Sequence, residues 1–459
     1  MLIVPVSQFE FDIYKLSLPI SVDHPSLMFQ SAWKLADGRS IAAVFFNQNT
    51  ACFDVLVCRR RVDNRLVLSC DMQGFKSQEA ATEKLIDELK LDNEVPKLHP
   101  GEKTRKPLLQ LANKKVGSHF RLLTNSISHF PALMAVGEVY LAMPNPDDNF
   151  VPDFQTANFD SRLFEVYLFA AFREQGVAVS QDHASPDFRL EREGQRCFVE
   201  AVTANPKDGR AQGFATPTFA PEEREERLIG PAAVRFAKTL RSKLQRGYED
   251  LPHVQGNPFA IAIADFHAPS SMVWTREALP SYLYGMQATV VDGPDGPKAI
   301  DSSVKHLLGE DHVPAGLFRD PGMAHLSAVI FSNAATLGKF NRMGFLAGWR
   351  PAGLSIVREG ILFDRTLGAL KPIPFSMDIL SKEYSDLCDG GEAWCQELEV
   401  FHNPLATNPL PFELLPGATH WFEEDKEVRC TSVWKNAILA SVTQLRMFNA
   451  NKEEDARRR

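Results

Sequence analysis

Apolar and polar positions in the first 91 residues follow the patterns of strands and then of a helix. Segments rich in Val, Phe and Cys at 40–47, 51–61 and 65–70 predict strands. An amphipathic pattern over 77–91 predicts a helix that follows them. We therefore expect an N-terminal α/β or α+β domain over residues 1–91.

The two regions that flank the middle of the chain have weaker patterns. Residues 92–158 begin with a stretch rich in Pro, Lys, Glu and Gly, and we expect a linker there, followed by a region whose elements we cannot assign. Within that region, 144–154 predicts a loop. Residues 271–450 predict a C-terminal α+β region that ends in a helix over 433–450. The charged residues 451–459 predict a disordered tail.

The middle of the chain has the clearest pattern. The continuous apolar run PFAIAIADF is typical of a buried central strand, and Gly230-Pro231 predicts a break in a helix. The segments predict, in order, a helix, a strand, a β-hairpin, a second helix and a second buried strand. They cover residues 159–176, 177–181, 185–205, 224–251 and 258–266.

Composition narrows the class of protein. The chain has 459 residues, 44% of them hydrophobic, and its seven cysteines are scattered without a CxxC pair, which indicates free thiols in a reducing, cytoplasmic compartment. It contains no run of 18 apolar residues, so we expect no membrane span. The net charge of −8 excludes a surface coated in basic residues, but it does not exclude a local basic groove.

Two carboxylates in the predicted hairpin are the main candidates for chemistry. Asp187 follows Pro186 at the start of the first strand, and Glu200 lies inside the apolar run FVEAV of the second. A carboxylate buried in an apolar strand costs free energy unless it is paired or binds a cation. Two carboxylates on adjacent strands can converge on Mg²⁺, which prefers oxygen ligands and can neutralise charge that develops on a phosphate.

This arrangement resembles the PD-(D/E)XK nuclease superfamily. The resemblance covers about 159–266, and it implies an α/β fold, in which a restriction-endonuclease-like αβββαβ core over 159–270 has flanking α+β domains. Glu165 matches the acidic residue that the family carries on its first helix. The resemblance therefore implies that Glu165, Asp187 and Glu200 are catalytic and bind Mg²⁺ or Mn²⁺.

The sequence departs from the family's motif at one position. Val202 stands where the resemblance implies a lysine, and valine can neither polarise a water molecule nor contact a phosphate. In some superfamily members the lysine has moved to the following helix. Lys243 is our preferred catalytic replacement, with Lys238 and Lys207 as alternatives.

The second predicted helix carries further candidates for substrate binding. Gln245 and Tyr248 are three positions apart and thus share one helical face. They are similar to the Gln-xxx-Tyr motif of exonuclease-like branches, although their spacing is shorter. With Lys238, they are expected to bind the substrate. The helix's other basic residues form either a face for phosphate or a solvated surface.

We therefore expect a Mg²⁺-dependent hydrolase, a nuclease that cleaves phosphodiester bonds in DNA or RNA, with a possible protein partner for the flanking domains. The alternative is a catalytically inactive nuclease fold that serves as a scaffold or as a nucleic-acid-binding or protein-binding module. Individual residues also allow structural roles: Glu165 as a salt-bridge partner of Arg162, and His183 as a solvated loop residue instead of one that faces the site.

Overall fold

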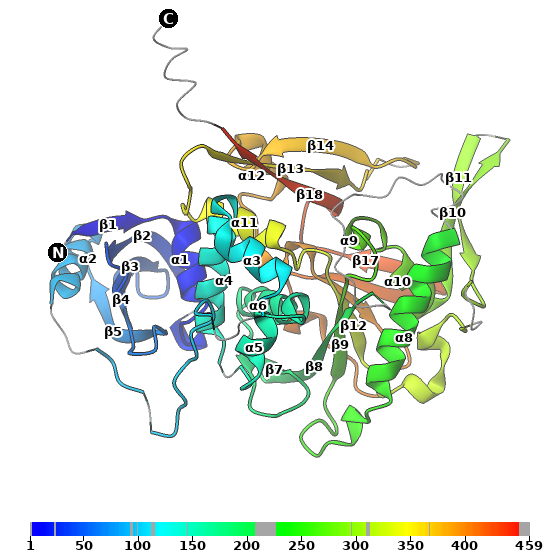
Figure 1. Cartoon of the computed structure of the whole chain (residues 1–459), viewed down its shortest axis with the longest axis horizontal. Helices are drawn as coiled ribbons and strands as arrows, with labels where there is room; N and C mark the ends of the chain where they lie inside the picture. Colours follow the sequence, from blue (N-terminus) through cyan, green and yellow to red (C-terminus); the bar gives the residue numbers. More distant parts are fainter. Residues whose placement is uncertain are drawn as a thin grey trace, which may run out of the picture. The chain divides into compact units, whose positions relative to one another are not determined.

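The computed structural model (Figure 1) describes residues 2–22, 24–91, 95–98, 100–111, 115–144, 146–206, 226–294, 296–308, 313–366 and 368–448. The chain divides into two compact units. The first comprises Met1–Arg162, Lys339–Leu354 and Arg446–Arg459, and the second Leu163–Gly338 and Ser355–Leu445. Lys207 and the predicted tail at 451–459 lie outside the described residues.

The first unit is built on a five-stranded antiparallel sheet in the order β1-β2-β3-β4-β5. Helix α2 (Gln78–Lys90) buries Ala81, Leu85 and Leu89 against this sheet, and Ser77 caps its first turn. The predicted strands and the predicted helix of this region are thus confirmed. The strands are β1 (Ile3–Val6), β2 (Leu27–Leu35), β3 (Ser40–Asn47), β4 (Cys52–Arg60) and β5 (Leu66–Phe75).

Short helices complete the first unit. They include three in the region to which the sequence assigned no elements, and the predicted loop over 144–154 is wrong at its end, where α5 forms. Phe150, Val151 and Phe154 bury one side of that turn, and the three prolines of the segment concealed it from the sequence pattern. The helices are α1 (Gln8–Lys15), α3 (Ser118–Asn125), α4 (Phe130–Ala142), α5 (Phe150–Phe154) and α11 (Leu337–Leu346).

The second unit is built on an eight-stranded mixed sheet in the order β17-β16-β15-β12-β9-β8-β7-β6. Strands β6, β7 and β8 are antiparallel neighbours, β8, β9 and β12 are parallel, and β15 runs antiparallel to β12. The strands are β6 (Ala178–Ser180), β7 (Phe188–Arg192), β8 (Gln195–Ala204), β9 (Phe259–Asp265), β12 (Ala328–Phe331), β15 (Glu399–His402), β16 (Thr419–Glu424) and β17 (Glu427–Thr431).

Two helices pack on opposite faces of this sheet beside β7 and β8. Phe172 of α6 (Phe159–Arg173) contacts Phe188 of β7, whereas α8 (Ala233–Leu244) shares a core with Phe198 of β8. The predicted break precedes α8, where Gly230 leaves helical geometry (φ −102°, ψ −109°) inside the π-helical turn η3 (Leu228–Ala232). The predicted order of helix, strand, hairpin, helix and strand is therefore present, in a chain of mixed α/β structure.

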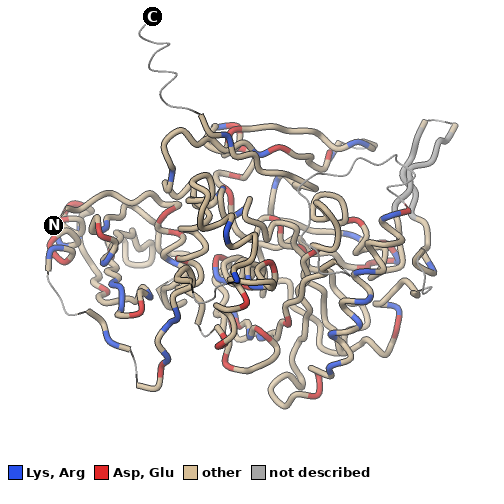
Figure 2. Tube along the Cα trace, in the orientation of Figure 1, with Lys and Arg blue, Asp and Glu red and all other residues tan. Residues whose placement is uncertain are grey.

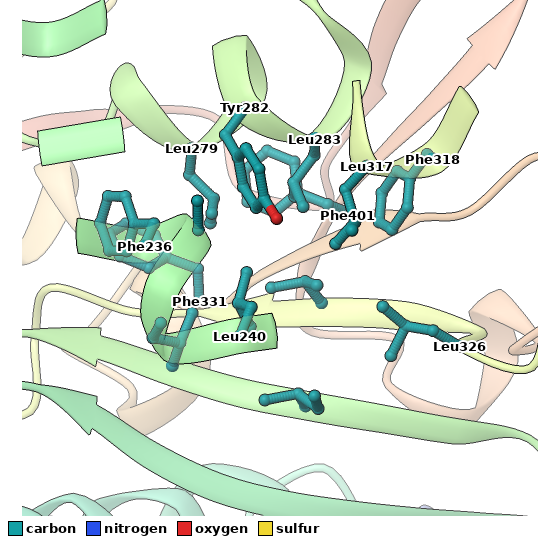
Figure 3. Packing of buried hydrophobic residues seen from close by; sticks show 14 of the residues in the cluster. Phe236, Leu240, Leu279, Tyr282, Leu283, Leu317, Phe318, Leu326, Phe331 and Phe401 are labelled. Carbon is teal, nitrogen blue, oxygen red and sulfur yellow. The ribbon is translucent and has the colours of Figure 1, made fainter. Parts of the chain in front are cut away.

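One hydrophobic core of the second unit lies on the α8 face of the sheet (Figure 3). Helix α8 contributes Phe236 and Leu240, and α10 (Ala278–Tyr284) contributes Leu279, Tyr282 and Leu283. Phe236 meets Phe331 of β12 edge to face, with ring centroids 5.9 Å apart. This packing fixes the position of α8 relative to the strands. It therefore also determines which side chains of α8 lie next to the sheet.

The C-terminal part of the chain corrects one prediction. The helix expected over 433–450 is wrong, because the described residues there form strand β18, which pairs with β13 in a sheet of order β14-β13-β18. Pairing with β13 outweighs helix propensity in a segment that also carries Ile, Val and Thr. Further strands are β10 (Met286–Gly293), β11 (Gly296–Ser303), β13 (Leu354–Leu362), β14 (Ile373–Asp378) and β18 (Ile438–Met447). Further α-helices are α9 (Ser271–Trp274) and α12 (Lys382–Leu387).

Within the described part of the chain, every helix falls short of the length and apolarity that a bilayer crossing requires.

Candidate active site

The β7–β8 hairpin brings Asp187 and Glu200 together. Phe188 pairs with Val199, so Asp187, immediately before β7, lies opposite Glu200 in the same register. The Oδ2 atom of Asp187 accepts a hydrogen bond from the backbone N–H of Ala201 (2.7 Å), which holds this carboxylate against β8. The prediction that the two strands are paired and antiparallel, with β9 in the same sheet, is confirmed.

Glu200 is the most deeply buried residue of this pair, with 4% of its surface exposed. Its Oε1 atom accepts hydrogen bonds from Lys243 Nζ (2.6 Å) and from the hydroxyl of Tyr248 (2.7 Å). Its Oε2 atom is buried and has no hydrogen-bond partner among the described residues. The ammonium group of Lys243 offsets the cost of burying the carboxylate, but half of the carboxylate's hydrogen-bonding capacity is left for another group.

The end of α8 explains how two of its residues reach the sheet. Lys243 precedes the buried Leu244 on the last turn, at the margin of the apolar stripe. Gly247 then takes a left-handed conformation (φ 65°), which any side chain would disfavour, and the chain turns into the 3₁₀ helix η4 (Tyr248–Asp250). This turn places the ring of Tyr248 beside Phe259 of β9, 5.5 Å between centroids.

The electrostatics of Tyr248 follow from this position. Burial raises the pKa of its phenol well above the usual range, and the neighbouring Glu200 raises it further. The phenol is therefore protonated at neutral pH and donates its hydrogen bond to Glu200. In the structure this tyrosine, predicted to bind substrate, supports the carboxylate.

Val202 stands at the motif position where the resemblance implies a lysine. Val202 is partly buried and packs against the core under α8. Of the two candidate replacement lysines that the structure describes, Lys243 is the one that contacts Glu200. Lys238 is exposed on the same helix, and Gln245, also predicted to bind substrate, is exposed at its end.

Glu165 takes a different place from the other two predicted carboxylates. It is buried, with 8% of its surface exposed, on α6, whereas Glu200 faces α8. Among the residues that the structure describes, no three His, Cys, Asp or Glu side chains form a group that could hold a metal ion. Asp187 and Glu200 are thus brought together without Glu165, whose role as a ligand stays a prediction.

A pair of stacked histidines lies next to this centre. The rings of His183 and His253 are 3.7 Å apart and nearly parallel, at 8°. His253 Nε2 donates a hydrogen bond to the carbonyl of Ser185 (3.0 Å), and its ring contacts Phe198. The sequence left the role of His183 open and gave no signal for His253, which follows Tyr248 in a segment without a motif.

Helix α8 gives the site a basic flank although the chain is acidic. Figure 2 shows Lys and Arg positions that recur along this helix. Lys238 and Arg246 are exposed, and Arg241 donates a hydrogen bond to the hydroxyl of Tyr282 (3.2 Å). A basic helix beside paired carboxylates is suited to a phosphate-containing ligand.

Comparisons of the chain with models of protein families, with curated proteins and with solved structures found no match.

Proposed function

We propose that the chain is a metal-dependent nuclease, with Asp187 and Glu200 as its acidic residues and Lys243 as its catalytic cation. The observation that carries this proposal is the 2.6 Å contact between Lys243 Nζ and the buried carboxylate of Glu200. The resemblance implies a lysine beside the carboxylate of Glu200, but the motif position for that lysine is occupied by Val202. A lysine from the next helix supplies the same pairing of charges.

The donor set fits a divalent cation. The Oε2 atom of Glu200 is buried without a hydrogen-bond partner among the described residues, and Asp187 lies across the hairpin from it. Carboxylate oxygens are the ligands that Mg²⁺ and Mn²⁺ prefer, so Asp187 and Glu200 would hold the ion. When bound, such an ion neutralises charge on a phosphate and makes water more acidic.

The protein's own residues have separate tasks in this proposal. Lys243 offers N–H donors and a positive charge to a phosphate oxygen, which favours the charge that builds up during phosphodiester cleavage. Tyr248 holds Glu200 in place through its protonated hydroxyl. The exposed Lys238 and Arg246 attract the nucleic-acid backbone.

A second candidate is a nuclease fold that binds nucleic acid or protein without cleaving it. Two observations favour it: Lys243 forms an ion pair with Glu200, and Val202, at the motif position, packs against the core. In this alternative the ion pair is a structural element of the sheet.

A cleavage assay decides between the two. Labelled single-stranded and double-stranded DNA and RNA are incubated with the purified chain and Mg²⁺ or Mn²⁺. We expect cleavage that falls by at least about 100-fold in Glu200→Gln and in Lys243→Ala, because each removes transition-state stabilisation. Lys238→Ala should raise KM and weaken the salt dependence without lowering kcat. Lys382→Ala, an exposed lysine of α12, is the control.

Absence of cleavage by the wild type with every metal and substrate would overturn the nuclease and leave the binding module. Wild-type rates in Glu200→Gln would overturn the assignment of the centre.

A further inference from the structure

The stacked histidines lie against a buried phenylalanine. Phe198 of β8 is buried, and the ring centroids of His253 and His183 lie 5.5 and 6.4 Å from its own. The two histidine rings stack on each other at 3.7 Å, and His183 is exposed. His183 therefore presents an aromatic ring to solvent near the acidic centre.

The loop that carries His183 is held from both sides. Asp182 forms an ion pair with Arg189 of β7 (2.7 Å), and the carbonyl of Ser185 accepts the hydrogen bond from His253. His183 is thus an exposed loop residue, as the sequence allowed, whose ring stacks on a neighbouring ring.

The stacked histidines lie close to the site of the proposed chemistry. Phe198 precedes Glu200 by two residues on the same face of β8, a separation of about 7 Å along the strand. The ring centroid of His183 lies 6.4 Å from that of Phe198. The two separations together span no more than about four base steps of a stacked strand, which rises about 3.4 Å per base. A strand with a phosphate beside Lys243 can thus bring a nearby base to His183.

A basic flank combined with an aromatic platform is the combination that binds single strands. Lys238 and Arg246 supply the charge, and His183 supplies the ring. Inside a duplex both faces of a base are covered by its neighbours, so a side chain can stack only on an unpaired or extruded base.

We propose that His183, supported by His253, is a stacking platform for an unpaired base, and that the chain's ligand is single-stranded nucleic acid. This inference rests on the proposed function for the identity of the ligand, but it concerns binding and can be measured without cleavage.

Binding is measured by fluorescence anisotropy in EDTA, with labelled single-stranded DNA and RNA oligonucleotides and the matching duplexes. We expect the single strands to bind more tightly. His183→Ala should weaken their binding roughly 5- to 100-fold, the usual effect of losing one stacked base. His183→Phe, which keeps a ring but no ring nitrogen, should restore it. His306→Ala, an exposed histidine of the same unit, is the control and should bind as the wild type does.

The outcomes separate this inference from the nuclease. Equal affinity of wild type, His183→Ala and His183→Phe overturns the platform, and so does a Phe variant as weak as the Ala variant. Tight single-strand binding that needs a ring at 183, with no cleavage under any metal, supports the platform and overturns the nuclease. Metal-dependent cleavage that is unchanged in His183→Ala and equal on single and double strands supports the nuclease and overturns the platform. A wild type that binds no oligonucleotide overturns both.

Discussion

Replacing Lys243 by methionine tests whether the ion pair with Glu200 supports the fold. The two side chains are 17% and 5% exposed, and their charged atoms are 2.6 Å apart, so the contact is largely screened from water. Removing one partner of a buried pair leaves an uncompensated charge, at a cost of several kcal/mol. We expect Lys243→Met to lower the free energy of unfolding by about 3 kcal/mol.

The companion variant removes the charge that Lys243 compensates. Glu200→Gln should cost less, about 1 to 2 kcal/mol, because its amide oxygen still accepts the hydrogen bond of Tyr248. The double variant carries no unpaired charge, so its loss should fall short of the sum of the single losses by about 2 kcal/mol. The matched control is the pair Lys84 and Glu88 on α2, 2.8 Å apart with side chains 46% and 15% exposed. Its coupling should be about 0.3 to 0.5 kcal/mol.

Hydrogen exchange of the β8 amides measures this effect in the unit that contains the pair, separately from the first unit. Additive losses at Lys243 and Glu200, within about 0.5 kcal/mol, would show that the two charges do not interact in the folded protein. Lys243 could then not take the role of the motif lysine that is absent at position 202.

Three further results are expected. Acid should destabilise the second unit, because burial and mutual repulsion lower the pKa of His402 to about 3, and burial lowers that of His420. Stability is then complete above the unfolded value of about 6.5 and falls as the pH drops toward 3. His402→Gln should flatten this slope in unfolding curves between pH 6.5 and 4.5. Millimolar Mg²⁺ or Mn²⁺ should raise the melting temperature of the wild type and not of Glu200→Gln; an unchanged wild-type melting temperature would refute metal binding. Tyr248→Phe should cost about 1.5 to 3 kcal/mol in unfolding free energy through its lost bond to Glu200, and an unchanged denaturation midpoint would refute that bond.

The elements around the site could be predicted because their signals are local. The apolar run of β9, the break at Gly230-Pro231 and the buried Glu200 inside β8 each depend on a few neighbouring residues. Strand β18 could not be predicted, since its conformation depends on pairing with β13, far away in sequence. The prediction of a helix there followed local propensity alone.

The choice among the lysines depended on the rotation of α8 about its own axis. Leu240 and Leu244 are buried, so Lys243 lies at the edge of the apolar stripe and can reach the sheet, whereas Lys238 is exposed. The periodicity of the helix could therefore have predicted which lysine faces the sheet. The position of His253 could not be predicted from the sequence, because a stack between two loops is determined by tertiary structure.

A lysine on a helix makes the centre depend on more of the protein than a lysine on the strand would. A residue two positions after Glu200 would stay beside it for as long as β8 remained paired. Lys243 stays there only while α8 is docked, and α8 is docked by contacts such as that of Phe236 with Phe331. Substitutions in that distant contact would undock the helix and separate Lys243 from Glu200 before the sheet itself opened. The centre is therefore vulnerable to mutations at positions outside the centre itself.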